Sequence, residues 1–135
     1  MIKYFLFFLI INLISNNEQY DDNILILNED KFDQALKKYD NLLIFFYTPH
    51  NKECQKLLKI FNTAANVLKK EGKTLAKVNC AKNKRIKFQY NIHKYPTLFL
   101  FNKWNNKYIQ YEGENKESDI IDFVRKKSVS IKSDL

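Results

Sequence analysis

Apolar residues along this chain recur with two alternating periods. Apolar-rich runs at 23–27, 41–48, 74–79, 97–101 and 107–111 predict strands, and a polar turn joins the last two as a hairpin. Apolar positions three and four residues apart predict helices over 52–70, over 83–90, from Ser118 to about Lys127, and after a cap at Asn28. Gly72 is placed to end the helix over 52–70. This order predicts an α/β fold in which β-α-β units precede a hairpin and a last helix.

A further apolar run opens the chain and does not fit that order. Residues 4–14 are apolar apart from Asn12, Lys3 precedes them, and Ser15 follows. A short apolar stretch behind a positive charge is typical of a secretory signal peptide, and this one is too short to span a bilayer comfortably. We therefore expect residues 1–15 to be a signal peptide and residues 16–135 to form one domain, with an uncleaved anchor as the alternative.

Composition and charge narrow the function classes. The chain has 135 residues, of which 45% are hydrophobic and 28% charged, and this fits one packed domain. The net charge is +8, but the basic residues are spread over every segment. Such a surface argues against a nucleic-acid interface, although acidic polypeptides or anionic membranes would be attracted. The two cysteines fall on separate expected elements, so we expect no disulfide between them.

The turn between the strand at 41–48 and the helix at 52–70 carries the candidate chemistry. It contains His50, Asn51 and Cys54, with Asn51 at the expected helix N-terminus. A dithiol redox site needs one thiolate that attacks and a second thiol that resolves the mixed disulfide. Only Cys54 supplies a sulfur here, and an asparagine at position 51 is suited to capping the helix.

Several segments together resemble the protein disulfide isomerase family. Residues 46–55 read Phe-Tyr-Thr-Pro-His-Asn-Lys-Glu-Cys-Gln, where that family usually has Phe-Tyr-Ala-Pro-Trp-Cys-Gly-His-Cys-Lys. Residues 75–80, Leu-Ala-Lys-Val-Asn-Cys, resemble its third strand, and Tyr-Pro-Thr at 95–97 resembles its cis-proline turn. The resemblance implies a thioredoxin fold, with a central mixed β-sheet flanked by helices on both faces and a cis peptide bond before Pro96.

The departures from that family fall on its redox centre. Asn51 replaces the attacking cysteine and cannot form a covalent bond to a client sulfur. His50 replaces the family's Trp, Phe45 replaces its buried, proton-transferring Glu, and His93 aligns with the Arg that tunes the resolving thiol. The resemblance therefore implies a retained scaffold without dithiol chemistry.

The two cysteines receive different expectations. Cys54 corresponds to the resolving position, and the helix N-terminus together with His50, Lys52 and Lys56 favours a thiolate there. Residual reactivity of the Cys54 thiol is therefore one hypothesis to test. Cys80, at the end of a strand, is expected to be a small buried hydrophobe.

Members of the family that lack active cysteines resemble chaperones or recruitment modules, which bind unfolded or extended polypeptides beside the cis-proline. In this chain that surface would be built from His50, Tyr95, Pro96 and Thr97. We expect a redox-inactive or attenuated disulfide isomerase-like binding protein without a cofactor or a metal ion. Two alternatives stay open: a monothiol isomerase or oxidoreductase acting through Cys54, and a structural subunit of a secretory-pathway complex that uses the turn around Trp104.

Both ends of the chain bear on location. The expected signal peptide directs the chain into the secretory pathway, and the last four residues, Lys-Ser-Asp-Leu, loosely resemble an endoplasmic reticulum retrieval signal. We therefore expect the endoplasmic reticulum lumen, with secretion as the alternative. A membrane would be a partner only if the signal segment stays uncleaved.

Overall fold

The computed structural model describes residues 2–15 and 17–128. The last four residues, which carry the expected retrieval signal, lie outside the described residues. Within the described residues, six strands form one sheet in the order β1-β2-β4-β3-β5-β6. The strands are β1 (Gln19–Asp21), β2 (Ile24–Leu27), β3 (Asn41–Tyr47), β4 (Thr74–Asn79), β5 (Thr97–Asn102) and β6 (Lys107–Gln110).

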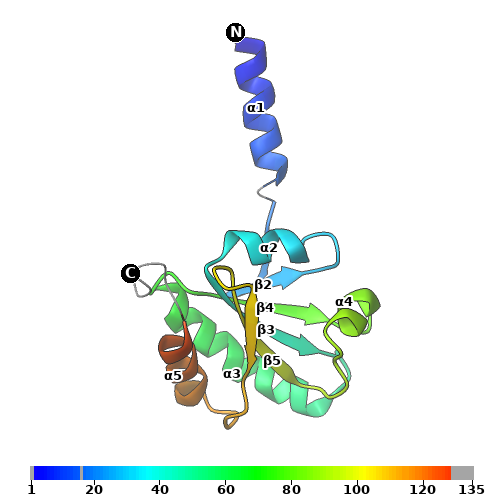
Figure 1. Ribbon diagram of the computed structural model, residues 1–135, viewed down its shortest axis with the longest axis vertical. Coiled ribbons are helices and arrows are strands. Elements are labelled where there is room, and N and C mark those ends of the chain that lie inside the picture. Colours follow the sequence, from blue (N-terminus) through cyan, green and yellow to red (C-terminus); the bar gives the residue numbers. More distant parts are fainter. Residues whose placement is uncertain (1, 16, 129–135) are drawn as a thin grey trace.

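The sheet is mixed, as the sequence predicted. Strands β2 and β3 both run parallel to β4, whereas β5 is antiparallel to β3 and β6 is antiparallel to β5 (Figure 1). Each of the five expected strands is present, with ends within one residue of the expected positions. The long apolar run of β3 places that strand inside the sheet, where both of its faces are covered.

Helices cover both faces of the sheet. Helices α3 (Lys52–Lys69) and α5 (Glu117–Lys127) cover one face, and α2 (Phe32–Lys38) and α4 (Lys84–Gln89) cover the other. Successive side chains of β3 point to opposite faces, so Phe45 packs with Phe61 of α3 whereas Phe46 packs with Phe32 of α2. The fold is therefore α/β with two cores that share one sheet.

The ends of α3 follow the sequence signals. Asn51 is its N-cap, and its side chain accepts a hydrogen bond from the backbone N–H of Cys54. At the other end Gly72 has a φ of +74°, which a glycine adopts without steric cost. The N–H of Lys73 then donates to the carbonyl of Leu68 at 2.9 Å, which closes the helix in a Schellman-like turn.

Helix α2 begins later than Asn28 alone would indicate. The Asn28 side-chain oxygen accepts hydrogen bonds from the N–H groups of Asp30 and Lys31, both at 3.0 Å. These bonds close a turn ahead of the helix, and the helix itself begins at Phe32. Asn28 therefore acts one turn earlier than a cap of α2 would, because it satisfies the N–H groups of that turn.

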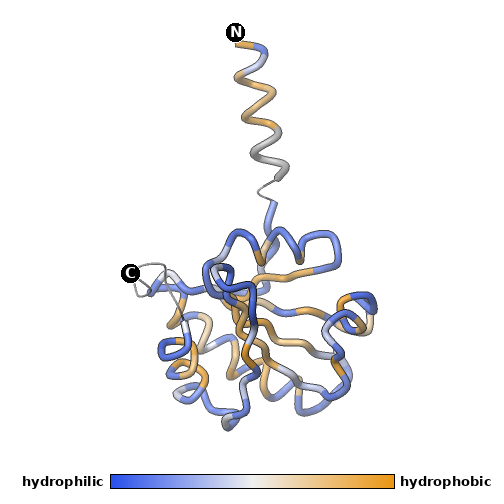
Figure 2. Tube along the Cα trace, in the orientation of Figure 1, coloured by the Kyte–Doolittle hydropathy of each residue, from blue (hydrophilic) through white to orange (hydrophobic). Residues whose placement is uncertain are grey.

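Helix α1 (Ile2–Ser15) contains the opening apolar run. It stands apart from the rest of the chain in Figure 1, and the side chains of residues 2–10 are exposed. Figure 2 shows the described part of α1 as mostly hydrophobic, like the central strands. Among the described residues, no helix combines the length and the apolar character needed to cross a membrane. Removal of this segment as a signal peptide stays a prediction.

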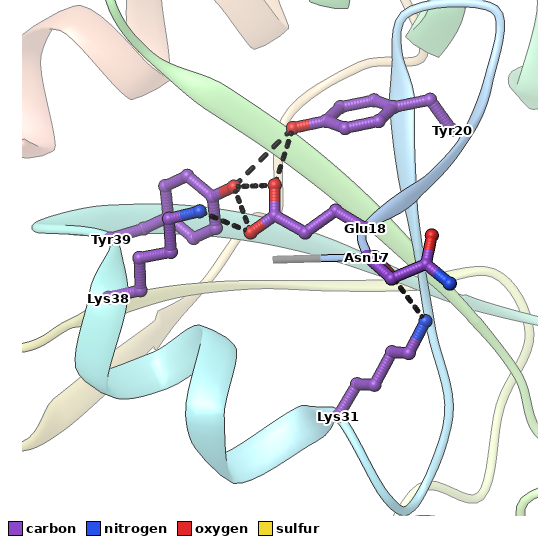
Figure 3. A network of polar contacts seen from close by, with 6 residues as sticks. All are labelled: Asn17, Glu18, Tyr20, Lys31, Lys38 and Tyr39. Atoms are coloured by element: carbon purple, nitrogen blue, oxygen red, sulfur yellow. Dashed lines mark hydrogen bonds and ion pairs between the residues drawn. The ribbon is translucent and has the colours of Figure 1, made fainter. Parts of the chain in front are cut away.

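Strand β1 is an element that the sequence pattern did not indicate. All three of its residues are exposed, and it pairs with β2 in antiparallel register. Side chains around it bind the segment to α2 through a polar network (Figure 3). The Glu18 carboxylate accepts hydrogen bonds from Lys38 Nζ at 2.6 Å and from the Tyr39 hydroxyl at 2.8 Å, and Lys31 Nζ donates to the Asn17 carbonyl at 2.7 Å. These contacts join residues 17 and 18 to α2 and to the residues at its two ends.

Candidate functional site

The candidate site lies where β3 ends and β5 begins. Phe46 and Thr97 are paired in the antiparallel register, so the turn that follows β3 and the proline that precedes β5 lie at the same end of the sheet. The N–H of Asn51 donates to the carbonyl of Thr48 at 3.3 Å, which closes that turn just before α3. The fold therefore brings the 48–54 and 95–97 segments together, as the resemblance implied.

Asn51 is held at the N-terminus of α3 by two hydrogen bonds. Its side-chain oxygen accepts from the N–H of Cys54 at 2.9 Å, and its backbone oxygen accepts from the N–H of Gln55 at 3.0 Å. The expectation that Asn51 caps the helix is confirmed. Because Asn51 uses an N–H group that would otherwise stabilise a negative charge at this terminus, the terminus offers less stabilisation to a thiolate.

Cys54 lies behind this cap and is almost inaccessible. Its exposed fraction is 2%. Burial raises the pKa of the Cys54 thiol, the charge of Glu53 acts in the same direction, and a hydrogen bond from the Thr48 backbone opposes them. Burial therefore outweighs the helix N-terminus and the exposed basic side chains nearby, which favour a thiolate, and the reactivity of Cys54 stays to be tested.

Cys80 lies at the end of β4 and is equally buried, with an exposed fraction of 1%. Burial raises the pKa of its thiol, although a hydrogen bond from the Tyr95 hydroxyl opposes the shift. Cys54 and Cys80 are both free thiols, as the sequence predicted. Cys80 packs on the α2 and α4 face, whereas Cys54 packs on the α3 and α5 face.

Tyr95 connects these two faces at the end of the sheet. Its ring packs against both hydrophobic cores, and its hydroxyl is hydrogen-bonded to Cys80. Burial, assisted by the neighbouring thiols, raises the pKa of Tyr95 to about 12. Tyr95 is therefore a neutral hydrogen-bond donor at physiological pH, and its side chain is half-buried.

The remaining predicted residues differ in what they present to solvent. The Tyr95–Pro96 peptide bond is cis, and Pro96 is half-buried. His50 is exposed. Thr97 is 7% exposed, and its hydroxyl donates to the carbonyl of Lys94 at 2.6 Å. His50 is thus open to solvent and Pro96 only partly so, whereas the Thr97 hydroxyl is bonded within the turn.

The interior below the site is apolar where the family has its buried acid. Phe45 is fully buried, and its ring centroid lies 5.3 Å from that of Phe61 and 5.5 Å from that of Tyr47. These rings give no group that accepts a proton from Cys54. His93 is exposed on the loop before Tyr95.

An ion pair between a buried lysine and an exposed aspartate, next to these rings, was not predicted from the sequence. Lys77 of β4 is opposite Phe45 in the strand register and is 6% exposed, and its ammonium forms an ion pair with Asp21 of β1. Its Nζ lies 5.7 Å from the Tyr47 ring centroid. The lysine within an apolar strand was a visible signal, but its partner was hidden because β1 was not recognised.

The chemistry that these side chains support is limited. Within residues 2–15 and 17–128, no cluster of three or more His, Cys, Asp or Glu side chains is arranged to hold a metal ion. The site consists of a capped helix N-terminus, one buried thiol whose pKa is raised, and a partly exposed turn around a cis-proline. The turn presents surface that another polypeptide can contact.

Comparisons with known proteins agree with this geometry. Residues 23–126 match the thioredoxin family model. Protein disulfide-isomerase 1 of Caenorhabditis elegans is 32% identical over 109 residues, which are 79% of this chain and 22% of that protein. Protein disulfide-isomerase of Saccharomyces cerevisiae is 29% identical over 119 residues, which are 85% of this chain and 23% of that protein. The chain thus spans less than a quarter of the length of these relatives.

Solved structures give the same result. Crystal form I of human ERp44 matches with a TM-score of 0.75 and 28% identity, over 82% of this chain and 31% of that chain. The first thioredoxin domain of mouse protein disulfide-isomerase A4 matches with a TM-score of 0.77 over 85% of this chain and 82% of that one; at 20% identity it supports the fold alone. The chain belongs to the thioredoxin family, and it is a thioredoxin-fold domain of the protein disulfide isomerase family.

Proposed function

We propose that this protein binds unfolded or extended polypeptides beside Pro96 and does not catalyse dithiol exchange. The observation that carries the proposal is the cap at Asn51, whose amide oxygen accepts the Cys54 N–H at 2.9 Å in the place where the family has its attacking sulfur. Without that sulfur, no mixed disulfide forms with a client at position 51. The scaffold around the cis-proline is retained.

The geometry of the turn supports binding without chemistry. His50 is exposed and Pro96 is half-buried, the Thr97 hydroxyl bonds to the Lys94 carbonyl within the turn, and Tyr95 packs against both cores. The residues just ahead of β5 form a bend, and exposed backbone at such a turn can pair with an extended client. The exposed part of the Tyr95 ring adds apolar contact area.

The redox part is tested by restoring the missing sulfur. In an insulin reduction assay with dithiothreitol, we expect the natural chain to give the uncatalysed rate and the Asn51→Cys variant to exceed it. The variant places two thiols at the spacing of the family's motif, with one at the helix N-terminus. Turnover by the natural chain equal to that of Asn51→Cys would contradict the proposal.

The binding part is tested with the two histidines of the chain, which are both exposed. His50 belongs to the proposed surface, and His93 provides a matched control on the loop ahead of it. We expect reduced, carboxymethylated α-lactalbumin to bind the natural chain and His93→Ala alike, and to bind His50→Ala more weakly. Equal binding by all three proteins would remove His50 from the surface, and no binding by any would overturn the proposal.

The monothiol alternative makes a different prediction. If Cys54 acts alone, a covalent adduct with a client appears on a non-reducing gel and disappears in a Cys54→Ser variant. The 2% exposure and the raised pKa of Cys54 both disfavour such an adduct. We expect no difference between the two lanes.

We propose further that the protein works in the secretory pathway, in the endoplasmic reticulum lumen, with secretion as the alternative. The apolar run that follows Lys3 within α1, together with the family of the relatives, supports this placement. An epitope inserted in the exposed hairpin turn leaves both ends of the chain intact. Retention with a lumenal marker is expected, and a purely cytosolic signal would contradict the placement.

A further inference from the structure

A groove lies on the α2 and α4 side of the sheet, beside the β5–β6 hairpin. Its volume is about 710 Å³. On β5 it reaches Phe101 and Asn102, at the opposite end of the strand from Pro96. Its walls come from α2, from the end of α4 and from the hairpin: Asp33, Leu36, Lys37, Gln89, Tyr90, Phe101, Asn102, Lys103, Trp104, Asn106, Lys107 and Tyr108.

Aromatic rings form much of this groove and are partly open to solvent. The Tyr90 ring meets Phe101 edge-on at 5.3 Å and Tyr108 edge-on at 5.7 Å between centroids. Tyr108 also stacks on Phe99 at 4.6 Å, yet 46% of it is exposed. Trp104, at the hairpin turn, is 43% exposed. Neighbouring exposed rings of this kind mark interaction surfaces.

The charges around the groove are mostly positive. Three of its residues are lysines and one is an aspartate, Asp33. Lys103 is paired with Asp40 at 3.2 Å and lies 4.6 Å from the Trp104 ring centroid. Neither Lys37 nor Lys107 has an ion-pair partner among the described residues. An occupant with carboxylates would therefore meet complementary charge.

The strand beside the groove is open along one edge. In the described part of the chain β6 is last in the strand order, and all four of its residues are exposed. Alternate backbone N–H and C=O groups of such an edge point away from the sheet. Tyr108 is opposite Phe101, so it lies on the groove face. A strand added to β6 would place every second side chain on that face.

We propose that this groove and the β6 edge bind an extended acidic polypeptide segment, with a large apolar side chain against Tyr108 and Trp104 and carboxylates near Lys37 and Lys107. The open strand edge favours a polypeptide over an oligonucleotide, because it offers backbone hydrogen bonds that only another peptide chain completes as a ladder. The site is separate from the surface beside Pro96. It stands whether or not that surface binds a client.

The chain contains one tryptophan, Trp104, so its fluorescence reports directly on the groove. The probe is a short peptide of alternating Glu and Phe, and the control peptide has Lys in place of each Glu. We expect the acidic peptide to change the Trp104 emission in a saturable way that weakens with added salt. The basic peptide should leave the emission unchanged.

Variants with matched controls locate the binding. We expect Lys37→Glu/Lys107→Glu to weaken the acidic peptide about tenfold or more, because two complementary charges become repulsive. The control Lys70→Glu/Lys126→Glu makes the same change of net charge at exposed positions outside the groove. Tyr108→Ala should also weaken binding, whereas Phe88→Ala, which removes a ring 75% exposed outside the groove, should not. Circular dichroism confirms that each variant is folded.

Three results would overturn the inference. One is equal weakening by the groove variant and by its charge control, because binding would then depend on net charge alone. A second is loss of binding in His50→Ala with no effect of the groove variants, which would place the peptide at Pro96. The third is saturable binding of a single-stranded oligonucleotide without binding of the acidic peptide.

Discussion

Asn51 has two effects: it stabilises the N-terminus of α3, and it leaves that terminus without a nucleophilic cysteine. Its amide oxygen takes the N–H of Cys54, and its backbone oxygen takes that of Gln55. A cysteine at this place would leave the first N–H free to stabilise a thiolate. The same helix end therefore serves either as a capped structural terminus or as a site that activates sulfur.

Replacing this cap should lower stability by a measurable amount. We expect Asn51→Ala to reduce the free energy of unfolding by about 1 kcal/mol, because the N–H of Cys54 loses its acceptor. Asn51→Ser keeps a capping oxygen and is expected to be near neutral. Urea unfolding followed by circular dichroism compares the three proteins, and an Asn51→Ala curve that overlays the natural one would contradict the role of the cap.

Cys54 should react slowly with alkylating agents while the chain is folded. Burial raises its pKa above the ordinary value of 9.0, so at neutral pH the folded chain holds less thiolate than the unfolded chain does. We expect iodoacetamide to modify Cys54 in a Cys80→Ala background much more slowly without urea than with it, as measured by mass spectrometry. Fast alkylation of Cys54 in the folded chain at pH 7 would contradict this expectation, because it would show an activated thiol.

The same shift predicts how stability depends on alkaline pH. A raised pKa in the folded state means that the unfolded chain loses the thiol proton first, so the free energy of unfolding falls as pH rises above 9.0. Cys54→Ser removes the thiol whose proton is bound more tightly in the folded chain than in the unfolded one. Its stability should therefore decline less between neutral and alkaline pH than that of the natural chain.

Individual site residues were predictable where sequence alone determines the role. Asn51 at a helix start and Pro96 within Tyr-Pro-Thr were identified from motifs, and the structure confirms the cap and the cis bond. The protonation of Cys54 was not predictable, because it depends on burial by other elements. The ion pair between buried Lys77 and exposed Asp21 likewise needs the tertiary fold to bring its partners together.

At the scale of elements, strong periodicity was a reliable guide and short edge strands were not. Helix α3 ends one residue from the expected position, because six of its apolar side chains form one buried stripe. Strand β1 has three exposed residues and no apolar alternation, so its pattern does not differ from that of a loop. Strand β1 forms because it pairs with β2 and because the polar network around Glu18 holds its segment in place (Figure 3).

The Glu18 network should make part of the stability depend on acidic pH. Burial alone would raise the pKa of Glu18, but hydrogen bonds from Lys38 and Tyr39 hold it below 4.5. The folded state therefore prefers the carboxylate, and this contribution is present above 4.5 and is lost as pH falls through the lowered folded value.

We expect Glu18→Gln to cost about 1 kcal/mol at neutral pH, because it weakens hydrogen bonds to a charged group. The difference from the natural chain should shrink between pH 7 and pH 3, as the Glu18 carboxylate of the natural chain begins to be protonated. Urea unfolding at the two pH values measures it. Glu29→Gln is a comparison elsewhere on the surface, and a pH-independent difference for Glu18→Gln would exclude the carboxylate as the cause.

At the scale of the whole molecule, two cores share one sheet and should unfold together. Ile120 of α5 is fully buried on one face, and Ile86 of α4 is 2% exposed on the other. We expect Ile120→Ala and Ile86→Ala each to cost about 2–5 kcal/mol through lost burial and the cavity that remains. Both should shift a single transition.

Two optical signals distinguish a single cooperative unfolding transition from independent unfolding of the two faces. Trp104 fluorescence reports the α2 and α4 side, and far-ultraviolet circular dichroism reports all helices. In Ile120→Ala the two curves should coincide, although the substitution lies on the face away from the tryptophan. Fluorescence unchanged while dichroism shifts would mean that each face unfolds by itself.

Strand β5 has six residues and runs from the turn at Pro96 to the hairpin beside Trp104. At roughly 3.3 Å per residue, the strand spans about 20 Å. A single client long enough to cover that span could engage both ends of the strand at once. Two individually weak contacts would then act as a bivalent clamp, in which holding one part of the client raises the local concentration of the next part. Retention of long unfolded chains over short peptides would follow from avidity, without a covalent bond.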